Sequence, residues 1–225
     1  MVKDRLYFSA DLYRFLIELK ENNNREWFAK NKERYETVYL QPSLRFIKDA
    51  GRRLRAVSPY LVADPKPFGG SLFRIYRDIR FSKDKSPYKT NLAIEFWHKR
   101  GEGHSSPGLY LHIQPGENFL GAGVWHPDMS ELNKFRKAIA NQSDEWQTVL
   151  DSKLHLHGDS LKRPPAGFPD DHQFIEDIKR RDFIASIPFT DRQIVGPNFM
   201  TKFIEAGTKT NPLNRFLAEA IGLRW

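Results

Sequence analysis

The hydrophobic positions of the first 57 residues recur with the period of an α-helix. Ser9 is suited to cap a first helix, whose apolar positions are Leu12, Phe15, Leu16 and Leu19. A second helix is predicted to begin after Asn23, because Glu26 three residues later completes a capping-box pattern. Pro42 kinks or restarts this helix, and a third helical stretch ends before residue 58. The N-terminal segment is therefore predicted to be helical.

Between residues 65 and 125 the pattern changes to short alternating runs that are separated by Pro and Gly clusters. We predict strands near residues 72–81, 91–98, 109–114 and 119–125, with a four-residue hairpin loop over 115–118. Strands that are joined by such short connections pair in the antiparallel sense.

Helical spacing returns after Asp128, where Glu131 completes a second capping-box pattern. We predict a loop with at most one strand pair over 152–170 and a strand near 183–188; the further helices are expected after Asp128, near 143–150, near 172–181, at about 197–206 and at about 212–221. No internal repeat or linker divides the chain. The sequence thus predicts a single α+β domain over residues 1–225, with a mainly antiparallel sheet (about 72–125) packed against N-terminal and C-terminal helices.

Composition is typical of a globular protein, since 40% of the 225 residues are hydrophobic and 13% are aromatic. The chain has no cysteine, and its N-terminus carries charges where a signal peptide would be apolar. No apolar run reaches the ~18 residues of a membrane span. We therefore expect a cytoplasmic protein without a membrane span.

Positive charge is concentrated in residues 73–90, FRIYRDIRFSKDKSPYKT. This stretch has six basic and two acidic side chains, a net +4 that is half of the chain's +8; they are Arg74, Arg77, Arg80, Lys83, Lys85 and Lys89 against Asp78 and Asp84. An excess of this size favours an anionic partner.

Strand alternation would place Phe73, Ile75, Ile79 and Phe81 on one face of the basic stretch and Arg74, Tyr76, Asp78 and Arg80 on the other. Arg77 falls on the apolar side, which predicts a bulge that re-aims it. We expect the three guanidinium groups to converge on one phosphate or carboxylate, with Asp78 orienting an arginine. Lys83, Lys85, Tyr88 and Lys89 then surround the ligand. The same charges equally fit a solvated face or an internal salt-bridge network.

Neighbouring strands supply candidate catalytic groups. Tyr110 and His112 share one side of their strand, and Glu95 shares a side with Trp97. If the strand phases match, His112 or Glu95 is placed to carry a proton and Asp78 to orient it, although a hydrogen-bonded sheet histidine is an equally simple interpretation. Gly121 and Gly123 leave room for a ligand or mark a bulge.

Other chemistries have little support. His155 and His157 form an H-x-H pair, but no further metal-binding pattern accompanies it, so we predict a surface loop and no metal site. No nucleophile elbow, Walker loop or dinucleotide fingerprint is present, and the sequence points to no particular cofactor.

The chain resembles a known family in four blocks: NNNREWFAKNKERY (22–35), FRIYRDIRFSKDKSPYKTN (73–91), GLYLHIQPGENFLGAGVWHPD (108–128) and LKRPPAGFPDDH (161–172). They are similar to the hallmark blocks of the domain of unknown function 2461 family, which occurs in bacteria and fungi. The resemblance covers nearly the whole chain and implies one domain. It implies no reaction, cofactor or catalytic residue, because none is established for the family.

The leading hypothesis is a site that binds a small phosphorylated or carboxylated ligand, with its transformation left open. The first alternative is nucleic-acid binding, in which the basic groups track phosphates and Tyr76, Phe81, Tyr88 and Trp97 stack on bases. The second is a structural or interaction module. The identity of the ligand and the oligomeric state do not follow from the sequence.

Overall fold

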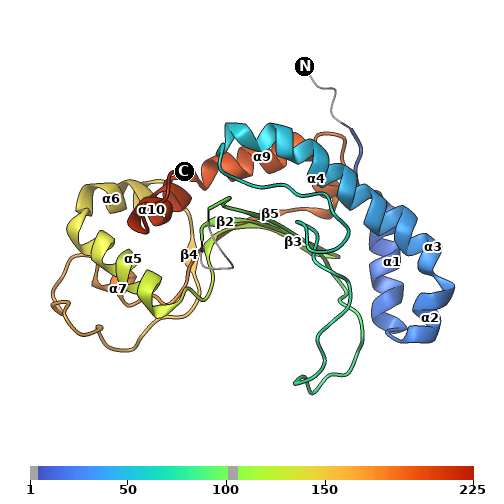
Figure 1. The fold of residues 1–225 in the computed structure, drawn as a ribbon, viewed down its shortest axis with the longest axis horizontal. Helices are drawn as coiled ribbons and strands as arrows, with labels where there is room; N and C mark the ends of the chain where they lie inside the picture. The colour runs from blue at the N-terminus through green and yellow to red at the C-terminus, as the bar shows by residue number, and fades with distance from the viewer. Residues whose placement is uncertain (1–4, 101–105) are drawn as a thin grey trace.

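The computed structural model describes residues 5–100 and 106–225 of the chain. A curved antiparallel sheet lies at its centre, and helices α4 and α9 run across the convex face of the sheet (Figure 1). The N-terminal helices lie beyond one end of the sheet, and α5, α6, α7 and α10 lie beyond the other. The expected fold class, α+β with an antiparallel sheet packed against helices, is confirmed.

The N-terminal segment is helical, as its hydrophobic period predicts. Its elements are α1 (Ala10–Glu21), α2 (Arg25–Lys30), α3 (Lys32–Tyr35), the π-helical turn η1 (Glu36–Leu40), α4 (Gln41–Arg53) and the 3₁₀ turn η2 (Leu54–Ala56). Ser9 caps α1 by accepting a hydrogen bond from the Asp11 N–H at 3.2 Å. The cap of α2 is Asn24, one residue later than predicted, and its side chain accepts from the Trp27 N–H at 2.9 Å.

The sheet has five strands within the described residues, in the order β1-β2-β3-β5-β4 and all antiparallel. They are β1 (Leu92–Trp97), β2 (Gly108–Gln114), β3 (Glu117–Val124), β4 (Leu156–His157) and β5 (Phe183–Phe189). The β2–β3 connection is a two-residue turn of Pro115 and Gly116, shorter than the predicted four. Gly116 has φ 75°, a conformation that glycine adopts without strain.

The strand that was predicted near residues 72–81 does not form. Leu72 makes an isolated bridge to Ile94 of β1, and the chain then leaves the sheet and folds back on itself. The Arg77 N–H donates to the Pro87 carbonyl at 2.9 Å, and the Lys89 N–H donates to the Ile75 carbonyl at 2.7 Å. Residues 73–90 therefore form an irregular hairpin, called the arm below, which extends away from the sheet (Figure 1).

The remaining helices follow β3. They are α5 (Met129–Asn141), α6 (Ser143–Asp151), α7 (Ile175–Ile178), α8 (Asp191–Ile194), α9 (Phe199–Lys209) and α10 (Asn211–Ala220). The helix that was expected near 172–181 is the short α7. None of the helices in the described ranges has the length and apolar character that crossing a bilayer requires.

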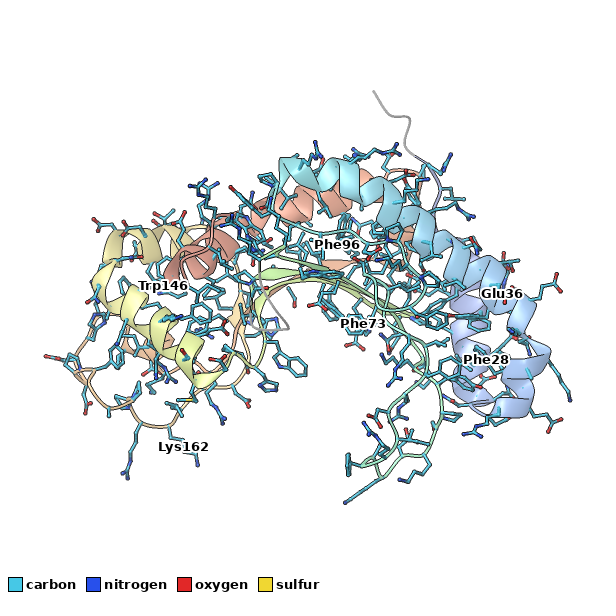
Figure 2. The ribbon with its side chains drawn as sticks, viewed as in Figure 1. Phe28, Glu36, Phe73, Phe96, Trp146 and Lys162 are labelled. Carbon is cyan, nitrogen blue, oxygen red and sulfur yellow. The ribbon has the colours of Figure 1, made fainter. Side chains whose placement is uncertain are left out.

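Two apolar clusters form the core. In the larger one, Phe96 of β1 packs on Phe203 of α9, with ring centroids 5.4 Å apart, and Phe203 packs on Phe46 of α4 at 5.2 Å. In the second cluster, Trp146 of α6 lies against Phe216 of α10, with ring centroids 4.9 Å apart. Phe96 and Trp146 mark these clusters in Figure 2. The first cluster covers one face of the sheet and leaves the other to polar and aromatic side chains.

Candidate functional site on the open sheet face

The strand register places the predicted catalytic candidates on one side of the sheet. Glu95, Tyr110, Gly121 and Ser186 are neighbours in one row across β1, β2, β3 and β5. The adjacent row on the same side contains His112 and its neighbour Phe119. The register, which the sequence left open, thus brings Glu95 and His112 to the same side of the sheet. This side is called the open face below, because no helix of Figure 1 covers it.

His112 lies half-buried at the centre of the open face. Its Nδ1 is 3.2 Å from the Tyr110 hydroxyl and 3.5 Å from the Asn91 amide nitrogen, and both groups can donate to it. The ring stacks on Phe119, with centroids 4.9 Å apart and an interplanar angle of 8°. These contacts favour the neutral tautomer with its proton on Nε2. That nitrogen is buried and has no hydrogen-bond partner within the described residues.

Burial favours the neutral forms of both His112 and Tyr110. It lowers the pKa of His112, while Glu117 and the Gln114 side chain act in the opposite direction. It also raises the pKa of Tyr110 to about 12, with smaller contributions from Glu95 and Glu117. The pair therefore presents a neutral imidazole and a protonated hydroxyl.

One basic side chain from the arm, that of Lys89, approaches this pair through the ring of Phe73. Lys89 is half-buried, and its Nζ is 5.1 Å from the centroid of the Phe73 ring. The Phe73 ring in turn meets Tyr110 edge-on, with centroids 6.1 Å apart. Figure 2 shows Phe73 on the side of the sheet away from Phe96. Lys89 thus reaches the open face through an aromatic contact.

Lys89 and Arg74 are close enough to repel each other. Burial lowers the pKa of Lys89, and the charge of Arg74 lowers it further. Among the described residues, neither side chain forms a hydrogen bond or an ion pair. Arg74 and Lys89 are therefore neighbouring cations that form no ion pair with a described carboxylate, although the charge of Arg74 contributes to lowering the pKa of Asp78.

Arg77 and Arg80, in contrast, each have their own aspartate. Arg77 pairs with Asp84 and lies 3.4 Å from the Ser82 hydroxyl. Arg80 binds Asp78 through Nη2 at 2.7 Å and Nε at 3.0 Å, and the bonds from Arg80 lower the pKa of Asp78 to about 2. The expected convergence of three guanidinium groups is not observed, and Asp78 lies on the arm, with Arg80 and not with His112.

The other predicted residues of the basic stretch have different positions. The Lys85 Nζ donates to the Ile79 carbonyl at 3.0 Å, and Lys83 is exposed near the tip of the arm. Tyr88 is buried at the base of the arm, where its ring stacks on Phe28 of α2 with centroids 4.1 Å apart. The buried Tyr88 side chain thus supports the arm by its contact with α2.

Asn23 fixes the base of the arm to the N-terminal helices. Its side-chain amide donates to the Tyr88 carbonyl at 2.9 Å and accepts from the Tyr88 N–H at 3.0 Å. This two-bond contact sets the position of the adjacent Lys89. Asn23 was predicted only as a helix cap, and Asn91 and Phe119 were not predicted at all, because their roles depend on contacts with other segments of the chain.

The two glycines of β3 differ in their roles. A Cβ on Gly123 would lie 1.9 Å from the Phe183 carbonyl oxygen, so this glycine allows β5 to approach β3. A Cβ on Gly121 would meet only ordinary contacts at 3.7 Å. Because Gly121 has no side chain, no side-chain atoms rise from the open face between Tyr110 and Ser186.

The H-x-H pair lies at the edge of the sheet, where His157 belongs to β4 and His155 precedes it. The His157 Nε2 is 2.9 Å from the Ser186 hydroxyl, and the rings of His155 and His157 are 6.3 Å apart. Within residues 5–100 and 106–225, no three His, Asp or Glu side chains are grouped as a metal ion requires.

Fold and site together define an α+β protein with a curved antiparallel sheet, one face of which is covered by helices and the other of which is polar and aromatic. Residues 11–216 match the family model described as conserved hypothetical protein (DUF2461), and the chain belongs to that family. Comparison with curated proteins and with solved structures gives no match.

Proposed function

We propose that the open face binds a small ligand that carries a phosphate or carboxylate group, with Arg74 and Lys89 as its anion contacts. One observation carries the proposal: these neighbouring cations have no carboxylate partner within the described residues, and one of them is half-buried. Holding like charges together costs free energy, which a bound anion offsets. Arginine supplies a bidentate contact and lysine a point charge, a combination that suits phosphate.

The rest of the arm assists binding in this proposal. Arg77 and Arg80 are already paired with aspartates, so they contribute as part of a positive field that attracts an anion, as do Lys83 and Lys85. Tyr88 acts through the backbone, because the Asn23 contact holds Tyr88 and therefore Lys89 in place.

Proton transfer to or from the bound ligand is the chemistry that fits the face. The Nε2 of His112 is one of several buried side-chain atoms that have no hydrogen-bond partner within the described residues, and Tyr110 and Asn91 orient the ring through Nδ1. In this proposal His112 carries the proton. Glu95, in the neighbouring row, acts indirectly, because its charge contributes to raising the pKa of Tyr110. Asp78 has no part in it, because Arg80 holds it on the arm.

Thermal unfolding in inorganic phosphate tests the binding step. At a phosphate concentration of about 100 times Kd, binding stabilises a protein by about 2.7 kcal/mol, or roughly 5–10 °C for a chain of this size. The Arg74→Gln/Lys89→Gln variant is expected to lose at least half of the shift. The Lys134→Gln/Lys137→Gln variant, which removes the same charge from exposed positions of α5, should retain it. Equal shifts in the two variants would refute the site.

A second candidate function rests on the tip of the arm. Phe81 is 95% exposed there, and the guanidinium carbon of Arg80 lies 5.8 Å from the centroid of its ring. An exposed aromatic ring among cations is suited to stack on a base of single-stranded nucleic acid while lysines contact phosphates.

Fluorescence anisotropy with labelled oligothymidylate in low salt tests this second function. Phe81→Ala should weaken binding by about five- to tenfold or more, because one stacked base contributes roughly 1–3 kcal/mol. Phe68→Ala is the matched control, since Phe68 is also exposed, at 76%, and lies outside the arm. Undetectable binding by the unaltered protein in low salt rules this function out.

A further inference from the structure

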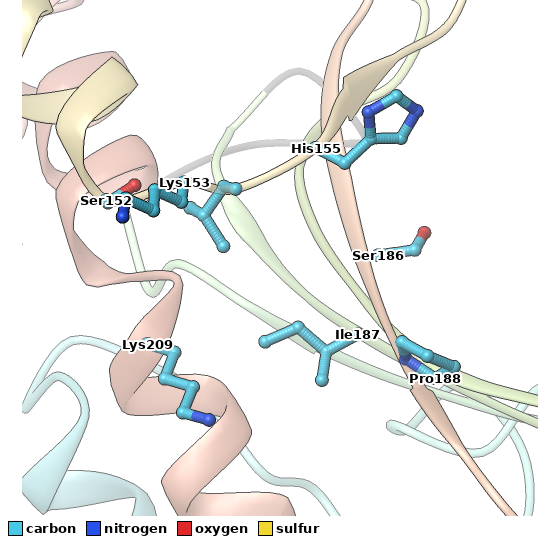
Figure 3. A pocket seen from close by; sticks show the side chains of 8 residues that line it. Ser152, Lys153, His155, Ser186, Ile187, Pro188 and Lys209 are labelled. Atoms are coloured by element: carbon cyan, nitrogen blue, oxygen red, sulfur yellow. The ribbon is translucent and has the colours of Figure 1, made fainter.

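A serine and a histidine are in contact on the open face, on the last two strands of the sheet order. The Oγ of Ser186, in β5, is 2.9 Å from the Nε2 of His157, in β4. Figure 3 shows the Ser186 side chain on the same side of β5 as His155, with Ile187 on the opposite side. Both members of the pair are half-buried, so solvent still reaches them. The contact has the geometry of a nucleophile and its base.

The strand register places this pair beside an unfilled position of the open face. Ser186 is directly opposite Gly121 of β3, and Tyr110 of β2 is the next residue in the row. A Cβ on Gly121 would lie 3.7 Å from ring carbons of both Phe119 and Tyr110. Opposite Cα atoms of an antiparallel pair are about 4.5–5.5 Å apart. A small apolar group above Gly121 therefore touches two aromatic rings and is within reach of the Ser186 hydroxyl.

The packing around Gly121 does not require a glycine. Gly123, two residues further on, has φ 108°, and its Cβ would lie 1.9 Å from the Phe183 carbonyl oxygen, so its role is structural. Gly121 has neither a positive φ nor a close neighbour. Glycine weakens the interior of a strand, and it often marks a place where a ligand approaches the backbone. This second observation is independent of the Ser186–His157 contact.

We propose that Ser186 is a nucleophile that takes the acyl group of a small uncharged ester, with His157 as its general base. With its proton on Nδ1, the His157 ring accepts the hydroxyl proton at Nε2 while Oγ attacks the ester carbonyl carbon. The bond from that carbon to the alcohol oxygen breaks, and the alcohol leaves with the proton from Nε2. Water then attacks the acyl-serine, and His157 transfers a proton from this water to the departing Oγ. The products are a carboxylic acid and an alcohol.

The acyl group lies above Gly121 in this proposal. A short apolar acyl group, such as acetyl, fits there against the rings of Phe119 and Tyr110. The activity goes beyond anion binding at Arg74 and Lys89 and does not rest on it, since those cations lie on the arm and the reacting groups lie on β4 and β5.

Labelling with an alkyl fluorophosphonate tests the nucleophile. Attack by Oγ on phosphorus releases fluoride and leaves a phosphonylated serine, which mass spectrometry locates. Trypsin cuts after Arg181 and Arg192, and Ser186 is the only serine in the peptide between them. The unaltered protein is expected to be labelled there. The His157→Asn variant should react at least about a hundredfold more slowly, because a general base contributes about 10²–10⁴-fold in rate. No label on Ser186, or equal rates, overturns the proposal.

The matched control is His155→Asn. This variant removes the neighbouring imidazole, whose ring centroid is 6.3 Å from that of His157, and keeps the contact between His157 and Ser186. It should be labelled at the rate of the unaltered protein. A decrease as large as that of His157→Asn would refute the assignment of the base.

The Gly121→Ala variant tests the position of the acyl group. Its added methyl group makes only ordinary contacts, so the variant should fold, and its melting temperature should not fall. Hydrolysis of 4-nitrophenyl acetate should be at least about tenfold slower, because displacing a bound ester by even ~1 Å is costly. An unchanged rate would show that the acyl group does not lie above Gly121.

A last variant separates this activity from the anion site. Arg74→Gln/Lys89→Gln should hydrolyse the uncharged ester at the rate of the unaltered protein. A large loss would show that the reaction depends on the arm, which would overturn an independent nucleophile at Ser186. A retained rate supports the proposal even if the open-face cations fail the thermal test with phosphate.

Discussion

Replacing Asn23 with alanine is expected to release the base of the arm. The Asn23 side chain makes two hydrogen bonds to the backbone of Tyr88, one as donor at 2.9 Å and one as acceptor at 3.0 Å. Tyr88 is buried, and its ring remains stacked on Phe28 when the amide is removed. The substitution therefore tests the two polar contacts while the aromatic contact is kept.

The magnitude follows from the two lost bonds. A typical net contribution is about 1 kcal/mol for each hydrogen bond, so the contact is worth about 2 kcal/mol. If the whole loss lowered the free energy of global unfolding, the melting temperature would fall by roughly 4–8 °C for a chain of this length. Because the arm projects from the sheet, we expect most of the loss as local opening of residues 75–89, with exchange of their amide protons about thirtyfold faster.

Hydrogen exchange followed by mass spectrometry measures this effect peptide by peptide. Asn22→Ala is the matched control, since the Asn22 side chain bonds only to the Glu18 carbonyl of α1, at 2.9 Å. It should change exchange near the end of α1 and leave the arm protected. Unchanged exchange of residues 75–89 in Asn23→Ala would show that the amide contact does not hold the arm.

Two other predictions concern pH and the core. Burial lowers the pKa of His112 below its ordinary value, so the unfolded chain binds more protons and stability should fall as the pH drops below about 6.5. Urea midpoints at pH 7.5 and 5.5 should differ less in His112→Phe, and an equal difference would contradict the assignment. Phe46→Ala removes a fully buried ring that stacks on Phe199 and contacts Phe203, and should cost about 3–5 kcal/mol in urea unfolding; Phe46→Leu should cost less, and a midpoint that does not move would contradict the packing.

The helices and the central hairpin follow from local signals. Ser9 and Asp128 cap α1 and α5 as predicted, because a side-chain oxygen that accepts from a backbone N–H within the first turn needs no distant partner. The alternation in β2 likewise predicts which side chains are buried, with Leu109, Leu111 and Ile113 inside. Local periodicity is therefore sufficient for these elements.

The arm was assigned wrongly because alternation does not specify a partner strand. Leu72 reaches β1, but residues 75–77 pair with 87–89, and the apolar side of this hairpin packs on Phe28 of α2 through Tyr76 and Tyr88. A segment that packs on aromatic side chains of a helix shows the same alternation of apolar and polar residues as a segment that pairs with a neighbouring strand. The position of β5 between β3 and β4 was likewise outside the reach of a local pattern.

The candidate basic residues can be named from the sequence, but which of them pair with acids cannot. Arg77 and Arg80 are paired with acids seven and two residues away, while Arg74 and Lys89, fifteen residues apart, form no ion pair with an acid in residues 5–100 or 106–225. The same rule of charge assistance applies to all four. Only the path of the folded chain decides which cations lie next to an acid. Spacing along the sequence therefore could not single out Arg74 and Lys89.

The base of the arm packs on α2, although β1, the strand that follows the arm, belongs to the sheet. Any fragment that begins after the N-terminal helices would keep β1 to β5 yet lack both Asn23 and Phe28, leaving Lys89 with no fixed geometry. A shortened chain that keeps the arm in place must therefore contain residues 22–35 as well as 71–97, although the two stretches are some forty residues apart.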